Sequence, residues 1–166
     1  MHHCQVTIGS KTIVAGELKI SFLLLNTRNH ISGGWGGSQA NNNAYMLIDQ
    51  VWTLLNPMTA RRSLLACAEY KGEIFAMGGN AGNVVDSTEI YSLTTGQWRN
   101  GPTLPYANNF GQGLNYGGSL YLIGGSYQSG NVLKLNKDEN AWVQVIDTAQ
   151  DATLKAHPAP IITIEN

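Results

Sequence analysis

Residues 73–98 read EIFAMGGNAGNVVDSTEIYSLTTGQW. An apolar run ends in a glycine pair, a polar loop follows, and a second apolar run places Tyr91 seven residues before Trp98. Short apolar runs bounded by glycine and polar turn residues predict β-strands joined by tight turns. Residues 64–70 (LLACAEY) are also mostly apolar, and Lys71-Gly72 after them predicts a hairpin turn. Together these runs predict four antiparallel strands.

The same unit recurs along the chain. Glycine pairs begin at positions 33, 78 and 124, at spacings of 45 and 46, and tryptophans stand at 52, 98 and 142, at spacings of 46 and 44. Two independent markers with one period predict a structural repeat, and four antiparallel strands make one blade of a β-propeller. We expect the markers to be structural, because buried aromatics pack sheets together and glycine turns the chain where a Cβ would collide. The markers are Gly33, Gly34, Tyr45, Trp52, Gly78, Gly79, Tyr91, Trp98, Gly124, Gly125 and Trp142.

These marks resemble the kelch repeat, in which an apolar strand ends in a glycine pair and a tyrosine precedes a tryptophan by about seven residues. The middle unit matches throughout. The third unit has Leu135 in place of the tyrosine, and the first is degenerate, with His30 where the middle unit has Phe75. The resemblance covers the chain from about Ile20 to Val145. It implies an all-β, kelch-type β-propeller of about three four-stranded blades, with partial blades at both ends.

We expect one kelch-repeat domain over residues 1–166. Its parts are blades at about 17–56, 57–105 and 106–147, and partial-blade strands or tails at 1–16 and 148–166. One period before the first tryptophan lies Val6, which predicts that residues 5–8 are the outer strand of a preceding blade. One period after the last inner strand, residues 160–164 are expected to be the next inner strand.

About three blades do not close a ring, because β-propellers typically have about 4–8. An open propeller exposes strand edges and an apolar sheet face, and both favour association. Three explanations stay open at this point. The chain is a piece of a longer protein, or it self-associates so that two copies close a propeller of roughly six blades, or it closes alone as an irregular small propeller.

Charge and hydropathy restrict the partners and the location. The chain has 10 basic and 11 acidic residues and a net charge of -1, so we expect neither nucleic acid nor a membrane as a partner. The longest apolar run, residues 22–25, is too short to span a bilayer. Residues 1–5 lack a signal-peptide profile, so we expect a cytoplasmic protein. Cys67 lies in an apolar run and is interpreted as a small core residue rather than a reactive thiol.

The sequence predicts no catalytic centre, metal site or cofactor. Galactose-oxidase-like enzymes resemble this fold and hold copper with two histidines and two tyrosines. Here His2, His3, His30 and His157 form no pair at metal-ligand spacing within one unit. The glycine pairs are not followed by a P-loop or a dinucleotide-binding motif. The alternative is a fragment of a propeller enzyme, galactose-oxidase-like or carbohydrate-active, whose active-site residues lie in absent blades.

The remaining candidate site is a surface made of loops. In such a blade the loop from the second to the third strand and the loop from the fourth strand to the next blade emerge on one face. The kelch resemblance implies that these loops hold a protein or peptide, as rigid scaffolds commonly do. The alternative for the arginines is solvated charge at a strand start, and for the asparagines it is plain turn chemistry. The candidate partner-binding residues are Trp35, Arg61, Arg62, Tyr106, Asn108, Asn109 and Tyr127.

Overall fold

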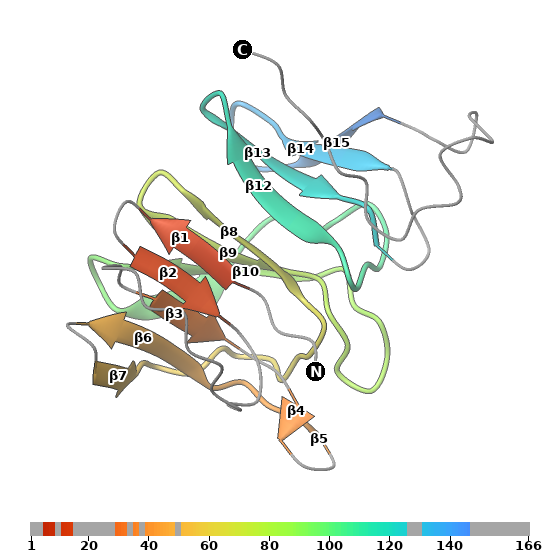
Figure 1. Ribbon diagram of the computed structural model, residues 1–166. Helices are drawn as coiled ribbons and strands as arrows, with labels where there is room; N and C mark the ends of the chain where they lie inside the picture. The colour runs from red at the N-terminus through yellow and green to blue at the C-terminus, as the bar shows by residue number, and fades with distance from the viewer. Residues whose placement is uncertain are drawn as a thin grey trace.

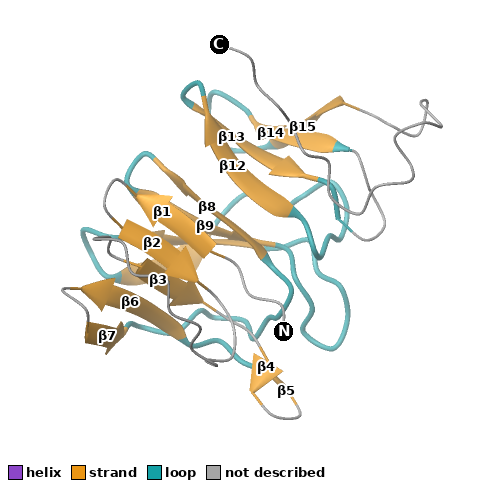
Figure 2. Cartoon of the chain, viewed as in Figure 1, coloured by secondary structure: helices purple, strands orange, loops and turns teal. Residues whose placement is uncertain are grey.

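The computed structural model describes residues 5–8, 11–14, 29–32, 35–36, 39–48, 51–125 and 131–146. These residues form fifteen β-strands and no helix, so the all-β prediction is confirmed. The strands make three antiparallel sheets and one short hairpin, and the sheets follow one another along the chain (Figure 1, Figure 2). The strand expected at residues 160–164 and the first glycine pair lie outside the described residues.

The second sheet has the predicted four antiparallel strands, in the order β11-β10-β9-β8. They are β8 (Ala66–Tyr70), β9 (Glu73–Met77), β10 (Thr88–Ser92) and β11 (Gln97–Asn100). Lys71 and Gly72 join β8 to β9 with φ angles of 52° and 77°, the left-handed geometry that tight hairpins require. The first strand begins at Ala66 rather than at Leu64, because the φ of 57° at Leu64 is not extended geometry.

The third sheet repeats this topology in the order β12-β13-β14-β15. Its strands are β12 (Gln112–Tyr116), β13 (Ser119–Ile123), β14 (Val132–Leu135) and β15 (Trp142–Ile146). The first strand begins only at Gln112, because Phe110, two residues earlier, has a φ of 60°, which is not extended geometry. Phe110 stands 46 positions after Leu64, which has the same backbone geometry. The same bend therefore recurs at the same point of the repeat.

The first sheet has five strands in the order β2-β1-β3-β6-β7. They are β1 (Gln5–Ile8), β2 (Lys11–Val14), β3 (Asn29–Ser32), β6 (Ala44–Ile48) and β7 (Val51–Leu54), and the hairpin of β4 (Trp35–Gly36) and β5 (Gln39–Ala40) lies between β3 and β6 in the chain. The prediction that residues 5–8 belong to a preceding blade is wrong, because β1 pairs with β3 and places Val6 opposite His30. The period relates equivalent residues but does not choose strand partners, and an unpaired edge of β3 accepts any compatible strand.

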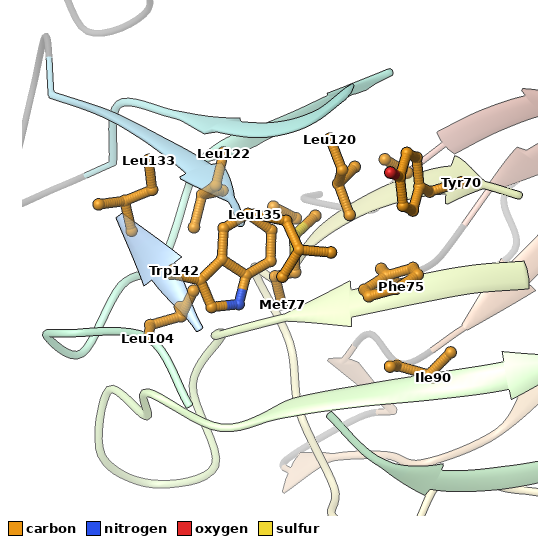
Figure 3. Packing of buried hydrophobic residues seen from close by; sticks show 12 residues of the cluster. Tyr70, Phe75, Met77, Ile90, Leu104, Leu120, Leu122, Leu133, Leu135 and Trp142 are labelled. Atoms are coloured by element: carbon orange, nitrogen blue, oxygen red, sulfur yellow. The ribbon is translucent and has the colours of Figure 1, made fainter. Parts of the chain in front are cut away.

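Two apolar clusters pack the three sheets together. The first interface cluster consists of Met58, Leu65, Cys67, Ile74, Ala76 and Tyr91, with Tyr45, Trp52 and Trp98 packed against it. The second interface cluster joins the second sheet to the third (Figure 3) and consists of Ala66, Ala68, Tyr70, Phe75, Met77, Ile90, Leu104, Leu120, Leu122, Leu133, Leu135 and Trp142. The described tyrosine and tryptophan markers therefore all lie in or against these clusters.

Candidate binding face

The connections between strands gather at one end of the sheets. We call this surface the loop face and define it by residues 41–43, 57–65, 78–87 and 101–111. In the second sheet these connections enter β8, join β9 to β10 and leave β11. Because neighbouring strands are antiparallel, all three lie at the same end of the sheet, opposite the turn at residues 71–72.

Backbone hydrogen bonds join the connections of the loop face to one another. The N–H of Gly79 donates to the carbonyl oxygen of Asn108 at 2.7 Å, and the N–H of Asn108 donates to that of Val85 at 3.1 Å. Ser63 and Asn80 exchange two N–H···O bonds of 2.9 and 2.7 Å. The connections therefore form one continuous hydrogen-bonded surface, which holds the exposed side chains in a constant arrangement.

The glycine pair of the second sheet is required for this arrangement. Gly78 and Gly79 have φ angles of 62° and 107°, in the left-handed region that favours glycine. A Cβ on Gly78 would lie 2.2 Å from the backbone oxygen of Asn108, and one on Gly79 would lie 2.7 Å from that of Ser63. Both clashes are with backbone atoms, so any other residue would push neighbouring connections away.

The tryptophan markers of the second and third sheets each connect their sheet to the segment that precedes it. The indole Nε1–H of Trp98 donates to the carbonyl oxygen of Asn56 at 2.8 Å. One period later, the indole of Trp142 donates to the carbonyl oxygen of Pro102 at 3.1 Å. The repeat in sequence is therefore also a repeat of hydrogen bonds between a sheet and the connection that precedes it.

The structure corrects the prediction that Arg62 binds a partner, because this residue is only 1% exposed. Its Nη1 donates to the carbonyl oxygens of Gly78 and Ser87, each at 2.9 Å, and its Nη2 pairs with Glu89 Oε1 at 2.8 Å. Burial lowers the pKa of Arg62, and the Glu89 carboxylate opposes this shift. A buried arginine with these partners holds the glycine pair and the loop after it rather than a ligand.

The carboxylate of Glu89 extends this network to the start of the second sheet. Its Oε2 accepts a hydrogen bond from the N–H of Thr59 at 2.6 Å, and its Oε1 accepts one from the N–H of Ala60 at 3.0 Å. Glu89 is itself 2% exposed. The Arg62–Glu89 pair therefore connects three parts of the loop face beneath its surface.

The structure also corrects the predictions for Asn108 and Asn109, which are 4% and 6% exposed. Asn108 Nδ2 donates to the carbonyl oxygen of Gly124 at 2.8 Å, as Arg62 does to Gly78 one period earlier. Asn108 and Arg62 stand 46 positions apart. They are thus equivalent residues of the repeat, and both hold the first glycine of a pair.

The other candidates have different positions. Arg61 is exposed on the loop face, and Tyr106 is half-buried with its ring packed against the second interface cluster. Trp35 begins the described strand β4, but its side chain lies outside the description, as does Tyr127. Of the residues predicted from the sequence, Arg61 and Tyr106 are therefore the ones with accessible side chains on the loop face.

Sequence reasoning missed Phe110, an aromatic residue of the loop face that is 45% exposed. It stands one period after Leu64, where the repeat predicts the start of an inner strand rather than an exposed side chain. Its N–H donates to the carbonyl oxygen of Leu64 at 2.9 Å, so the two equivalent bends lie side by side. Its φ of 60°, which no local sequence pattern indicates, places it before β12 and on the loop face.

The described residues contain no cluster of three or more histidine, cysteine, aspartate or glutamate side chains arranged to hold a metal ion. Cys67 is 4% exposed within the first interface cluster, as expected of a core residue, and it is not a free thiol. Within the part of the chain that the structure describes, no helix is long and apolar enough to cross a membrane.

Comparisons with known proteins point to one family. A family model described as the Kelch motif matches residues 61–105. Kelch-like protein 40 of Mus musculus is 26% identical over 133 residues, which cover 70% of this chain and 21% of that protein. Kelch-like protein 33 of Homo sapiens is 31% identical over 83 residues, which cover 49% of this chain and 16% of that protein. The chain thus spans at most about a fifth of the length of these curated relatives.

Comparison with solved structures agrees at the level of the fold. The structure titled "Structure of YjhT" superposes with a TM-score of 0.56 at 14% sequence identity. The match covers 70% of this chain and 50% of that chain. At this identity the similarity supports the propeller fold and carries no information about activity.

Proposed function

This chain belongs to the kelch-repeat family and folds as part of a β-propeller, and on that basis we propose that it is a non-catalytic module that binds a protein or peptide through its loop face. The observation that supports this most is the hydrogen-bonded loop face itself, in which backbone bonds hold neighbouring connections together. Such a surface loses little conformational entropy when it binds, because its loops are already ordered.

The exposed side chains of the loop face favour a particular kind of ligand. Arg61 is a cation suited to a carboxylate, and Phe110 is an exposed apolar ring. Phe110 is hydrogen-bonded to Leu64, three residues from Arg61 in the chain. We therefore propose that the ligand is a peptide segment that carries an acidic residue close to an apolar side chain. Tyr106 is a further candidate contact for this peptide.

Other expectations remain proposals of the same kind. The cytoplasmic location and the blade boundaries at about 57–105 and 106–147 rest on the sequence interpretation. The alternative of a propeller enzyme has no observation in its favour among the described residues.

Selection of peptides from a random library displayed on phage tests this function. Synthetic versions of the selected peptides are titrated against the parent chain and its variants, and the Kd is measured by fluorescence anisotropy. Phe110→Ala and Arg61→Glu should each weaken binding by about tenfold or more, because losing an interface hot spot costs about 2 kcal/mol or more and each 1.4 kcal/mol is about tenfold in Kd.

The matched control is Thr94→Ala, an exposed residue in the turn between β10 and β11 at the opposite end of the second sheet. It should leave the Kd unchanged. Selected peptides that bind both loop-face variants as tightly as the parent would contradict the proposal, as would peptides weakened only by Thr94→Ala.

A further inference from the structure

One face of the third sheet carries a row of four side chains, one from each strand. Leu114 lies opposite Tyr121, Tyr121 opposite Lys134, and Lys134 opposite Val143. Cross-strand partners lie on the same face of a sheet. The alternate residues of β13 and β14 belong to the second interface cluster, so this row faces away from the second sheet. We call it the open row.

The open row is apolar and accessible. Val143 is 50% exposed, and Leu114, Tyr121 and Lys134 are all partly exposed. Tyr116 and Val145, at 47% and 48% exposure, add further apolar area on the same sheet. Exposed apolar residues gathered on one sheet face commonly mark an interaction surface.

The repeat identifies what covers the equivalent row one blade earlier. In the second sheet the row consists of Ala68, Phe75, Ile90 and Arg99, which are cross-strand partners in the same order. Ala68, Phe75 and Ile90 are 3%, 2% and 5% exposed, because the third sheet packs on them. Figure 3 shows Phe75 and Ile90 in the cluster that the third sheet completes. The natural cover for such a row is therefore another four-stranded sheet of the same kind.

We propose that the open row is a sheet-packing interface, and that its occupant is a sheet of a second copy of this chain, so that two copies complete one propeller. The part of this chain matched by the solved propeller-like structure corresponds to 50% of that structure's chain, so two copies would supply both halves. Three sheets in each copy give six, within the usual range of about 4–8 blades. A twofold rotation closes such a ring without leaving further open faces.

The charges of the chain are compatible with this pairing. The net charge is only -1, so two copies repel each other weakly. Lys134 takes the position of Ile90, and its Nζ lies 5.4 Å from the centroid of the Tyr121 ring. A lysine stem packs along apolar surface while its ammonium group stays at the rim, so Lys134 can remain in a packed interface. Dimer formation of this kind does not depend on peptide binding by the loop face.

The oligomeric state of the whole chain in solution tests this inference. Light scattering on a sizing column should give twice the 17.9 kDa mass of one chain. Tyr121→Asp and Val143→Asp should each reduce the measured mass to that of one chain, because packing would desolvate the new carboxylate, and pairing with the neighbouring Lys134 only partly offsets that cost. Far-UV circular dichroism of both variants should retain the β-sheet spectrum of the parent, and Val143, on the outer strand, is the substitution least able to disturb the monomer.

The matched control is Leu54→Asp. Leu54 is 63% exposed on the outer strand of the first sheet, and it lies opposite Tyr45, which packs toward the second sheet. This control should remain a dimer. A parent that is a monomer at every concentration would overturn the inference, and so would a mass that grows with concentration beyond two chains. A dimer that survives Val143→Asp with its fold intact would also overturn it.

Discussion

At the scale of single residues, two adjacent arginines have opposite surroundings. Arg61 is exposed, whereas Arg62 is 1% exposed and forms an ion pair with Glu89. Successive side chains of an extended segment point to opposite sides, so neighbours of identical chemistry can separate completely. The sequence offers both as surface cations, and only the position of Glu89 shows which one is buried.

Arg62→Ala should lower the free energy of unfolding by about 3–5 kcal/mol, because it leaves the buried Glu89 carboxylate without its cation. Arg61→Ala should change it by no more than about 0.5 kcal/mol, as is usual for an exposed site. Urea unfolding of both variants at one protein concentration measures the difference. Equal effects of the two substitutions would contradict the assignment of the buried ion pair.

At the scale of structural elements, the first strands of neighbouring sheets approach each other closely. A Cβ on Gly113 of β12 would lie 2.3 Å from the carbonyl oxygen of Cys67 in β8 and 2.8 Å from the Cε methyl carbon of Met77. Gly113 stands 46 positions after Cys67, so the two are equivalent residues of successive sheets. The spacing of the sheets at this point therefore depends on the absence of a side chain in β12.

Gly113→Ala should destabilise the chain by about 1–3 kcal/mol, because the added methyl meets backbone atoms that cannot move without shifting a strand. Gln112→Ala, at an exposed position of the same strand, serves as the control and should have little effect. The midpoint of thermal unfolding compares the two. A Gly113→Ala variant that melts with the parent would show that the first strands are further apart than the structure has them.

At the scale of the whole molecule, the middle sheet is the only one of the three that is shown packed on both faces in the described residues. Ile74 and Ala76 of β9 are fully buried at 0% exposure and belong to the first interface cluster, while Phe75 between them belongs to the second. The third sheet packs on one face and leaves the open row on the other. Local stability should therefore be highest in β9 and lower toward β15.

Amide hydrogen exchange followed by mass spectrometry tests this order. The amides of Ile74 to Met77 should exchange most slowly, and those of Val143 and Val145 should exchange faster, because opening the outer strand exposes little buried area. If two copies pair through the open row, protection of β14 and β15 should also rise with protein concentration. Exchange of β9 as fast as that of β15 would contradict the central role of the second sheet.

Much of this architecture can be predicted from the sequence, because the sequence patterns that specify it are local. The glycine pairs, the hairpin turn at residues 71–72 and the apolar runs each act within a few residues, and their common period predicts the four-stranded unit. The second and third sheets have the predicted strand order, with strand starts displaced by two residues at the bends of Leu64 and Phe110. Those bends need left-handed backbone at residues that rarely adopt it, which no local pattern predicts.

Which side chains are buried, and which strands pair at the ends of the repeat, depends on contacts between distant segments. Arg62 is buried by Glu89, 27 residues away, and Asn108 is held by Gly124, whereas Phe110 remains exposed beside them. The pairing of β1 with β3 follows from an available strand edge, not from the period. Local sequence thus specifies the strands, turns and repeat, while burial and strand partnership depend on long-range packing, because a side chain is solvated or desolvated only by what the rest of the chain places over it.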